Sequence, residues 1–382
     1  MLRPRLLAGL PERGRTIIGE PGLGKSTLVR RIAAQAELDG GWVTRQVRLP
    51  LGADPLKATA AAVLRLADLA GLSASRERRL KDVLDRVRQV AASGISLTLD
   101  RASGPEPYTA LTDLLIEVGT AAIKARTVVI IHVDEIQNVI DENALSQLLI
   151  SLGDAITAEV SVELPGGGLR DRALPIAVYL TGLPEFAEKA SSRSGATFTR
   201  RFATQALAPI SDDEIRLALV PFLDPGWEVP DGEGGTVPIR MSQPAVEEIV
   251  GLCHGEPFLF QLLGERAWYA GESREMSLDD VRRGWEASKH EAAAHVERIL
   301  DRLPAKEREF VEQMATLPFE QRTATGIARA MGYKRATSAA PFAQRLDTVR
   351  GIINRGTRYT FRHRALEAYL TSGWPGLAEQ SN

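Results

Sequence analysis

The sequence predicts an α/β fold with a mostly parallel sheet, followed by a helical lid and a C-terminal winged-helix domain. Up to about residue 210, β-branched apolar runs alternate with helical patterns, as they do when helices connect parallel strands. Beyond Pro225 the strand-like runs give way to three helical patterns. From Pro304 onward, three short helices precede two short strands, which is the order of a winged helix-turn-helix.

Composition and charge restrict the class of protein. The chain has 382 residues, of which 44% are apolar and 25% charged, as in a globular protein with two or three domains. The formal net charge of −2 argues against a surface that binds polyanions throughout. The single cysteine, Cys253, excludes an intramolecular disulfide and favours a reducing compartment. We interpret its thiol as buried, with a nucleophilic role as the alternative.

No segment has the pattern of a membrane span or a secretory signal. The longest strongly apolar run, residues 128–133, is far shorter than the roughly 20 residues that a transmembrane helix needs. The N-terminus lacks a charged region followed by an apolar one. We therefore expect a cytoplasmic protein that does not contact a membrane.

Periodicity and turn residues place the elements of the first half. Strands are predicted at residues 15–18, 42–49, 127–135 and 175–180, with a short one ending at residue 207. Helices are predicted near residues 28–33, 55–72, 75–92, 108–124 and 143–158. Residues 94–107 and 159–174 are predicted to be irregular, the latter as a loop around three consecutive glycines.

The second half is predicted to be mainly helical. A capping box at Ser211 begins one helix, residues 224–235 form a connection, and helices cover residues 243–252, 256–270 and 278–303. Shorter helices follow at residues 307–315, 323–330 and 336–349, then strands at 351–354 and 358–361 and a helix at 363–370. We expect domains at residues 1–222, 223–303 and 304–382.

A glycine-rich segment lies between the first strand and the first helix. It fits the phosphate-binding pattern G-x-x-x-x-G-K-[ST], the Walker A motif, and consists of Gly19, Glu20, Pro21, Gly22, Leu23, Gly24, Lys25, Ser26 and Thr27. Glycines allow consecutive N–H groups to turn toward a phosphate, and the following helix directs its N-terminal dipole at the same place. Lys25 is expected to reach the β- and γ-phosphates, and the Ser26 hydroxyl to bind Mg²⁺. An accidental glycine-rich turn is the alternative.

A second motif ends the apolar run of residues 127–133. Asp134 and Glu135 follow this strand, where a parallel strand delivers side chains to a ligand crevice. This is the form of a Walker B motif, in which Asp134 would hold Mg²⁺ and Glu135 would act on the attacking water. Together the two motifs predict a P-loop NTPase that binds ATP and Mg²⁺. His132, within the strand, is interpreted as a packing residue.

A third strand end is also polar. Thr181 follows the strand at residues 175–180, close to the expected γ-phosphate position. Its hydroxyl is expected to contact phosphate or the attacking water, with ordinary turn chemistry as the alternative.

These features together resemble AAA+ ATPases, in particular the secretion-pathway A, transposition-helper, archaeal-ATPase and initiator-like branch. The resemblance covers residues 15 to about 300 and includes the segments 180–186, 201–202 and 207–211. It implies that Arg200 or, preferably, Arg201 is an arginine finger that reaches a neighbouring subunit's nucleotide; a surface salt bridge near Glu185 or Glu188 is the alternative. No arginine occupies the place of the family's sensor-2 residue.

The lid carries a motif that is similar to one in STAND signalling ATPases. Residues 253–258, with the sequence CHGEPF, resemble the Gly-x-Pro lid motif of those proteins. The resemblance implies that Pro257 packs near the base and couples the nucleotide to the position of the lid.

The C-terminal module is basic, unlike the rest of the chain. Residues 304–370 contain twelve Lys or Arg and six Asp or Glu, a net charge of +6. Lys334 and Arg335 precede the third helix, and Arg355 and Arg358 flank the wing tip. This asymmetry predicts contact with double-stranded DNA, with internal packing as the alternative.

The leading functional hypothesis is an ATP-hydrolysing switch that couples the nucleotide to assembly, as a homo-oligomer or with a protein partner, or to DNA binding. Alternatives are a DNA-associated loader or regulator whose assembly ATP controls, and a STAND-type scaffold with slow hydrolysis and an internally packed winged helix. A small-molecule kinase shares the Walker A motif, but the acidic pair Asp134–Glu135 and the long helical tail disfavour it.

Overall fold

The computed structural model describes residues 2–72, 82, 83, 85, 87, 107–163, 167–186, 190 and 200–377. The chain divides into two compact units. The first comprises residues 1–19 and 25–206, and the second comprises residues 20–24 and 207–382. The segment between β1 and α2 therefore belongs partly to each unit, and we call residues 20–24 the loop tip.

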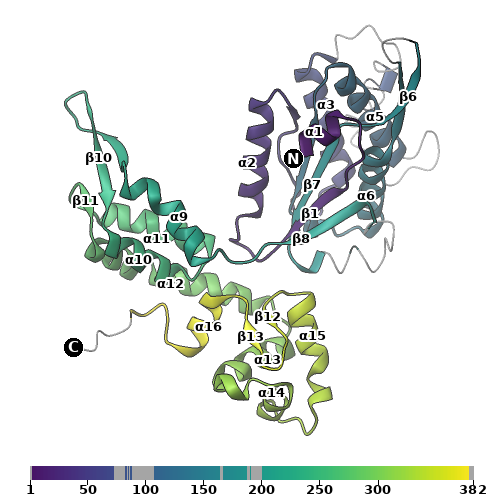
Figure 1. Cartoon of the computed structure of the whole chain (residues 1–382). Helices are drawn as coiled ribbons and strands as arrows, with labels where there is room; N and C mark the ends of the chain where they lie inside the picture. Colours follow the sequence, from purple (N-terminus) through teal and green to yellow (C-terminus); the bar gives the residue numbers. More distant parts are fainter. Residues whose placement is uncertain are drawn as a thin grey trace. The chain divides into compact units, whose positions relative to one another are not determined.

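The first unit is built on a parallel sheet (Figure 1). Its strand order is β2-β4-β7-β1-β8, and β3 also pairs with β4. All of these pairings are parallel. The strands are β1 (Gly14–Ile18), β2 (Trp42–Val43), β3 (Val47–Arg48), β4 (Val129–Asp134), β7 (Ile176–Gly182) and β8 (Phe202–Ala206).

The central strand β4 explains why the sheet is parallel and covered. All six of its residues are buried, as its continuous β-branched run predicts for a strand with helices over both faces. β7 lies between β4 and β1, with Val133 paired to Leu180 and Ile17 paired to Thr181. The C-terminal ends of these three strands therefore meet at one edge of the sheet.

Helices cover the two faces of the sheet unequally. Helix α2 (Lys25–Leu38) lies on one face, and α3 (Pro55–Leu69), α5 (Pro107–Lys124) and α6 (Glu142–Thr157) pack together on the other (Figure 1). The side chains of Asp54 and Asp141 cap α3 and α6 by accepting bonds from backbone N–H groups of the first turn. Two short helices, α1 (Leu2–Leu7) and η2 (Ile136–Asn138), also belong to this unit.

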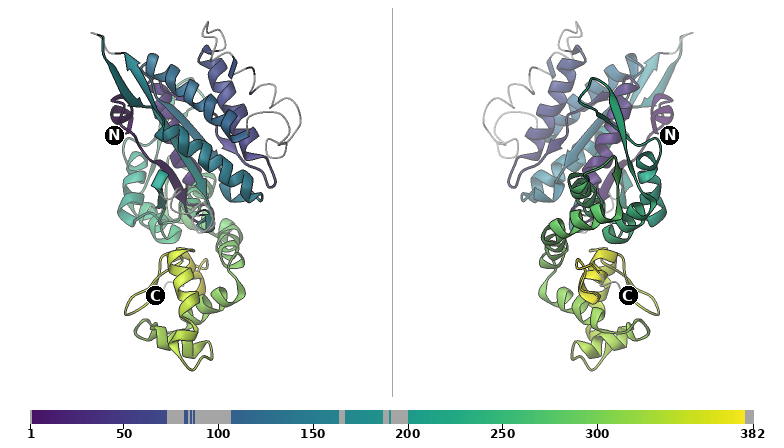
Figure 2. Two further views of the ribbon diagram at one scale, coloured as in Figure 1. Left: turned by 90° about the vertical axis from the view of Figure 1, so that its right-hand side faces the viewer. Right: turned by 90° about the vertical axis from the view of Figure 1, so that its left-hand side faces the viewer.

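Two predictions for the first half are corrected. The expected single strand at residues 42–49 is divided into β2 and β3, because only their backbones follow β4 closely enough to pair with it. The expected loop at residues 159–174 is an antiparallel ribbon of β5 (Glu159–Glu163) and β6 (Leu169–Ala173), shown projecting from the unit in Figure 2. Its alternating exposure, with few buried side chains, conceals it from a search for apolar runs.

The second unit begins with a helical part that also contains a small sheet. Its helices are α9 (Asp212–Leu223), α10 (Gln243–Cys253), α11 (Pro257–Ala270) and α12 (Leu278–Asp301). The predicted capping box at Ser211 is present. The expected connection at residues 224–235 is wrong in part, because β9 (Trp227–Pro230) pairs with β10 (Thr236–Met241), which also pairs with β11 (Glu275–Met276).

The C-terminal elements follow the order predicted for a winged helix. They are α13 (Ala305–Thr316), η3 (Phe319–Gln321), α14 (Ala324–Ala330), η4 (Ala336–Ser338), α15 (Ala340–Thr348), β12 (Ile353–Asn354), β13 (Thr360–Phe361) and α16 (Arg364–Thr371). The helix expected at residues 336–349 is divided into η4 and α15, and Pro341 stands in the first turn of α15, where its ring is tolerated.

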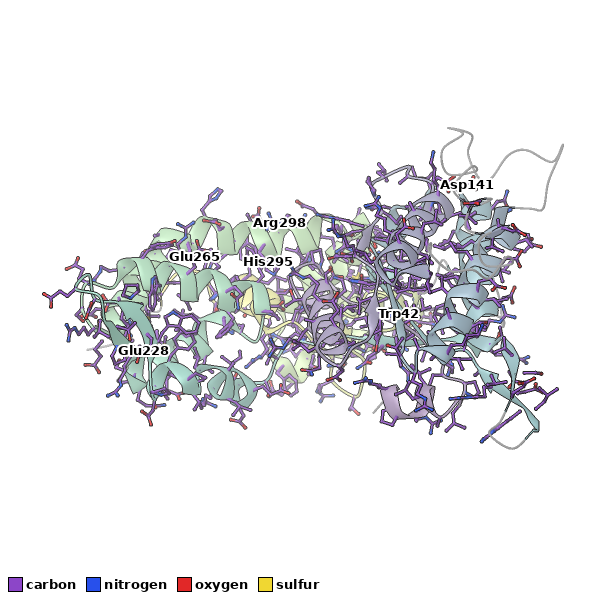
Figure 3. The ribbon with its side chains drawn as sticks, turned by 90° about the horizontal axis from the view of Figure 1, so that it is seen from above. Trp42, Asp141, Glu228, Glu265, His295 and Arg298 are labelled. Atoms are coloured by element: carbon purple, nitrogen blue, oxygen red, sulfur yellow. The ribbon has the colours of Figure 1, made fainter. Side chains whose placement is uncertain are left out.

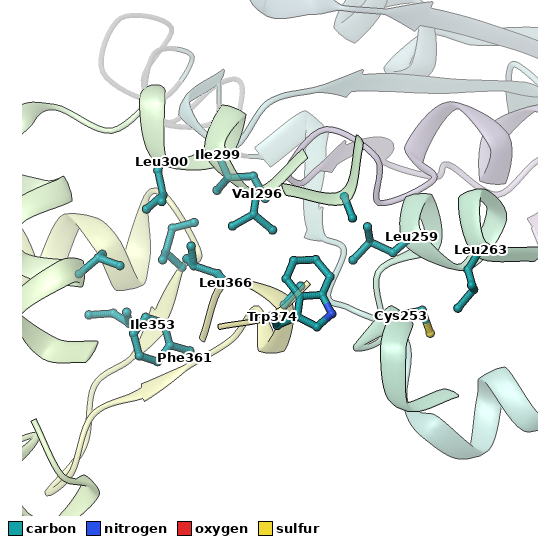
Figure 4. Close-up of a cluster of buried hydrophobic side chains, with 14 of the residues drawn as sticks. Cys253, Leu259, Leu263, Val296, Ile299, Leu300, Ile353, Phe361, Leu366 and Trp374 are labelled. Atoms are coloured by element: carbon teal, nitrogen blue, oxygen red, sulfur yellow. The ribbon is translucent and has the colours of Figure 1, made fainter. Parts of the chain in front are cut away.

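One hydrophobic core joins the helical part to the C-terminal elements. Figure 4 shows Leu366 and Trp374 close to Cys253 and Val296, and all four side chains are buried. The Trp374 indole N–H donates to the Leu252 carbonyl at 3.2 Å. The C-terminal elements are therefore packed directly on the helical part through a shared core.

Two sequence predictions concern residues outside the described ranges. The helix at 75–92 and the irregular segment at 94–107 lie largely there, although Val83 and Val87 are described and buried in the first core. Among the described helices, each is too short or too polar to cross a bilayer.

Candidate functional site

The backbone of the Walker A segment has the conformation that its glycines predict. Gly22 and Gly24 have φ of 88° and 79°, a region that glycine reaches without steric cost. Among the described residues, no atom lies within 4 Å of the position that a Cβ on Gly24 would take. Lys25 is the first residue of α2, and its Nζ donates to the Gly19 carbonyl at 2.8 Å. The backbone beside Gly24 therefore faces open space at a helix N-terminus, as phosphate binding requires.

Ser26 and Asp134 come together across the edge of the sheet. The Ser26 Oγ donates to Asp134 Oδ2 at 2.9 Å, although the residues are 108 positions apart. Gln46 also donates to this carboxylate, and the Glu135 N–H donates to Oδ1 at 3.0 Å. Burial alone would raise the pKa of Asp134, but hydrogen bonds from Thr181 and Ser26 hold it below its usual value. Asp134 is thus an ionised carboxylate beside the Walker A serine.

Thr181 connects Asp134 to a buried histidine. The Thr181 hydroxyl donates to Asp134 Oδ1, and His132 Nε2 lies 3.0 Å from the same hydroxyl oxygen. The Thr181 hydroxyl donates its proton to Asp134, so the Thr181 oxygen acts as the acceptor toward His132. The His132 imidazole is therefore in the tautomer that carries its hydrogen on Nε2. Burial lowers the pKa of His132 to about 4, so the imidazole is neutral at pH 7. The signal for His132 is a polar residue within an apolar strand, a pattern that favours packing over a catalytic role.

Glu135 leaves the strand in an unusual conformation. Its φ of 59° is in the left-handed region, which is uncommon for a residue with a side chain. Gln137 donates a hydrogen bond to its carboxylate, and Arg48 Nη2 lies 3.9 Å from Oε1. The Glu135 side chain is about one-third exposed, so it is more accessible than that of Asp134.

These residues fit a magnesium nucleotide. Hydroxyl and carboxylate oxygens are the ligands that Mg²⁺ prefers, and the ion usually takes only one or two of them from the protein. Within the described part of the chain, no Lys or Arg forms an ion pair with Asp134. Ser26 and Asp134 would therefore hold Mg²⁺, and the open backbone beside Gly24 would receive phosphate.

The loop tip makes its contacts within the second unit. Glu20 is 3% exposed and forms an ion pair with Arg302, which follows α12. A Cβ added to Gly22 would lie 2.9 Å from the side chains of Phe258 and His295, and Figure 3 shows His295 on α12. Arg302 was not singled out in the sequence, because it is one of 47 Lys and Arg residues and stands 282 positions from Glu20. A larger side chain at Gly22 would separate the loop tip from α11 and α12.

Three further candidates make no hydrogen bond or ion pair with Ser26 or Asp134 in the part of the chain that the structure describes. Pro257 is the first residue of α11, directly after the buried Glu256. Arg201 forms an ion pair with Asp154 of α6 at 2.5 Å, whereas Glu188, one of the two acids suggested as its partner, lies outside the described residues. Because Phe202 pairs with Gly14, Arg201 lies at the N-terminal edge of the sheet, opposite the edge where β1 and β7 end. The exposed Arg200 precedes it, and the finger role remains a prediction.

A buried acid and two histidines form a cluster that sequence reasoning missed. Glu256 is 1% exposed, and its Oε1 accepts a hydrogen bond from His363 Nδ1 at 2.7 Å. His295 Nε2 lies 3.9 Å from Glu256 Oε2, and the His295 ring stacks on Phe258 with centroids 4.6 Å apart. Burial would raise the pKa of Glu256, but His295 and His363 lower it to about 2. The three residues come from α11, α12 and the start of α16, so no local sequence pattern unites them.

Comparisons with known proteins agree with this geometry. Residues 12–188 match the family model of the AAA domain. No curated protein sequence matches the chain.

Two solved structures are similar over nearly the whole chain. A Walker-type ATPase of Pyrococcus abyssi has a TM-score of 0.54 at 15% identity, with 97% of this chain and 94% of that chain covered. The ORC2 protein of Aeropyrum pernix, solved with ADPNP and ADP, has a TM-score of 0.51 at 16% identity, with 95% and 89% covered. At these identities the likeness concerns the fold. With the AAA-domain match over residues 12–188, it shows that this chain has the fold of a P-loop NTPase followed by a helical C-terminal part.

Proposed function

We propose that this chain is an ATP-hydrolysing molecular switch that passes its nucleotide state to assembly, DNA or partner binding through its second unit. The observation that carries the proposal is the Ser26–Asp134 hydrogen bond of 2.9 Å, which brings the Walker A and Walker B motifs together at one edge of the sheet. Bound ATP supplies the phosphoryl group, and Mg²⁺ neutralises phosphate charge.

Each residue at this edge of the sheet has a separate task in the proposal. The loop backbone and Lys25 bind phosphate oxygens, and Ser26 and Asp134 bind the metal ion. Glu135, which is partly exposed, accepts a proton from the attacking water and orients it. Thr181 holds Asp134 in place and is held in turn by His132.

The division of the Walker A segment supports coupling to the second unit. Gly19 and Lys25 belong to the first unit, whereas the loop tip between them packs with the second. Binding of phosphate by this loop would change the surroundings of Glu20 and Gly22, which contact Arg302, Phe258 and His295. Because one core includes α12 and α16, such a change would reach the winged-helix elements.

Two substitutions separate binding from hydrolysis. Lys25→Ala is expected to abolish binding of a fluorescent ATP analogue, because it removes the loop's cation. Glu135→Gln is expected to retain ATP and to lower turnover by about 10²–10⁴-fold, the usual contribution of a general base. Glu163→Gln, on the exposed β5, is the matched control and should behave as the unmodified protein. Equal turnover in Glu135→Gln and the unmodified protein would contradict the assignment.

A second candidate function is binding of duplex DNA by residues 304–370. Eight of the twelve basic residues there form ion pairs with acids. Among the described residues, the other four make no ion pair: Arg329, Lys334, Arg335 and Arg358. These four cations favour a phosphate-contacting surface that is smaller than the sequence suggested, since Arg355 pairs with Asp347.

A salt titration of the full chain on duplex DNA tests this second function. The logarithm of affinity should fall linearly with the logarithm of salt, and Lys334→Gln with Arg335→Gln should reduce the slope by about 2. Arg308→Gln, which disrupts pairs with Asp301 and Glu312, is the control. Absence of binding at low salt would favour the alternative, a STAND-type scaffold with an internally packed winged helix, for which the shared core is the supporting observation. Mass measurement with ADP and with a non-hydrolysable ATP analogue would then show whether nucleotide controls assembly.

A further inference from the structure

A large apolar groove opens on the helical part of the second unit. Its cavity volume is about 780 Å³, and it lies among α9, α11 and the β9–β10–β11 sheet. The floor consists of buried aliphatic and methionine side chains: Leu219, Met241, Ile249, Leu262 and Met276. Neither Ser26 nor Asp134 lines this groove.

Aromatic side chains form the walls of this groove. They are the partly buried Phe222, Phe258, Phe260 and Trp268 and the exposed Trp227. Trp227 is 55% exposed and stacks on Phe222, with ring centroids 5.7 Å apart and an interplanar angle of 13°. A large exposed aromatic that is held rigidly by a neighbour is the type of residue that anchors protein interfaces. Exposure of this area to water also costs free energy that a partner would recover.

The charges around the groove are acidic. Two carboxylates, Glu265 and Glu291, line it, and no Lys, Arg or His does so among the described residues. Glu291 is paired with Arg266 at 2.5 Å, whereas Glu265 on α11 is exposed. Figure 3 shows Glu265 and Glu228 on the same helical part, and Glu228 adjoins Trp227 in β9.

The acidity extends over the whole helical part. Residues 207–303 contain nineteen Asp or Glu against nine Lys or Arg, a net charge of −10, while the complete chain carries −2. Such a field repels nucleic acid and attracts cationic partners over a distance of about a Debye length. Aromatic faces add a favourable interaction with Lys and Arg.

We propose that this groove binds an amphipathic α-helix of a partner protein, with its apolar side chains in the groove and Lys or Arg residues along both flanks. A helix with apolar residues at i, i+3, i+4 and i+7 presents one apolar face, which suits a groove with aromatic walls and a methionine-containing floor. The basic flanks satisfy Glu265 and the surrounding acidic surface, which supplies specificity and a fast association rate. The groove would connect a partner to the unit that contains the loop tip.

The test uses the full chain and a defined probe. A fluorescein-labelled 18-residue helical peptide of Leu and Lys is titrated with protein, and its anisotropy is followed. A Leu/Glu peptide with the same spacing and a scrambled Leu/Lys peptide are the comparison probes. Saturable binding of the Leu/Lys helix is expected, at least about 10-fold tighter than that of either comparison peptide. Its affinity should fall with salt.

Substitutions locate the bound peptide. Trp227→Ala should weaken binding at least about 10-fold, as expected for an interface anchor, and Glu265→Lys should weaken it about 3-fold or more. Tyr269→Ala and Glu272→Lys are matched controls, since both residues are exposed on the same helical part but do not line the groove. Unchanged thermal unfolding verifies that each variant is folded.

The outcomes decide the proposal independently of ATP hydrolysis. Equal binding of the Leu/Glu peptide, equal affinity in Trp227→Ala and the unmodified protein, or loss of affinity in the control variants would overturn it. Concentration-dependent self-association that Trp227→Ala removes, without peptide binding, would instead assign the groove to a second copy. Lys25→Ala should bind the Leu/Lys peptide normally, so that failure of the nucleotide site and failure of the groove are distinguishable.

Discussion

Asp134 in the first unit and Glu256 in the second are both buried carboxylates, with 4% and 1% exposure. Both have a lowered pKa. Asp134 is held by neutral donors, mainly the hydroxyls of Thr181 and Ser26. Glu256 is held by histidines, one of which donates to it at 2.7 Å.

From this difference we infer that Asp134 is a ligand-binding group and that Glu256 is a structural one. The Asp134 carboxylate accepts hydrogen bonds, but no Lys or Arg side chain is among its described contacts. A bound metal cation would therefore neutralise its charge. The charge of Glu256 is matched within the protein, because its hydrogen bond favours a protonated His363. We therefore expect substitutions near Asp134 to affect function more than folding, and those near Glu256 to have the opposite effect.

The largest expected effect is on the stability of the second unit. His363→Gln removes the charge that faces buried Glu256 and should lower the free energy of unfolding by about 3–5 kcal/mol, as when a buried ion pair loses one partner. Urea unfolding followed by tryptophan fluorescence measures it. Arg216→Gln disrupts an exposed pair with Glu247 and should cost less than about 1 kcal/mol. Equal losses in both variants would contradict the comparison.

Asp134→Asn should produce the converse result. Removal of the carboxylate charge should lower Mg²⁺-dependent ATP turnover by at least about 100-fold, because the metal ion loses its charged ligand. The free energy of unfolding should fall by less than in His363→Gln, because the amide keeps one oxygen that accepts hydrogen bonds and leaves no buried charge without a partner. A malachite green assay for phosphate and urea unfolding of the same preparation give the two numbers. An unfolded Asp134→Asn variant would show that Asp134 is structural.

A decrease in pH should have opposite effects on the contributions of His132 and His363 to the free energy of unfolding. Burial lowers the pKa of His132 to about 4, so as pH decreases the unfolded chain binds a proton at His132 before the folded chain does. The free energy of unfolding should therefore fall by roughly 2–3 kcal/mol between about pH 6.5 and about pH 4. Burial would also lower the pKa of His363, but the bond to Glu256 raises it, so its contribution is complete below pH 6.5 and is lost as pH rises further. Unfolding of His132→Gln and His363→Gln over this range checks the signs. The acid-side loss should disappear in the first variant and the alkaline-side loss in the second.

A smaller effect is expected from Thr181→Val. The valine keeps the shape of the side chain but removes the hydroxyl between His132 and Asp134, which should lower turnover about 10-fold by leaving the carboxylate less well oriented. Thr157→Val is the control, because the Thr157 hydroxyl donates to the Gly153 and Asp154 carbonyls of its own helix. A loss of ATP binding without a change in turnover of the bound nucleotide would contradict a positioning role for Thr181.

Local sequence was sufficient for most of the sheet and for the main residues of the site. The β-branched run that became β4 and the glycines before α2 encode their structures locally, because burial on two faces and φ above zero each demand particular residue types. The exposed ribbons β5–β6 and β9–β10 were missed, because few of their side chains are buried and an apolar pattern is the main signal of a strand.

The sequence by itself determined that this chain holds a phosphate-binding loop, an acid-tipped parallel strand and a basic C-terminal module, since each is a contiguous pattern. Only the tertiary structure decided the contacts between distant segments. His132 became part of the Asp134 network through β7, Arg302 reached Glu20 across 282 positions, and His363 met Glu256 across 107. Side chains so far apart in the chain carry no joint local signal, and only the packing of whole elements makes them neighbours.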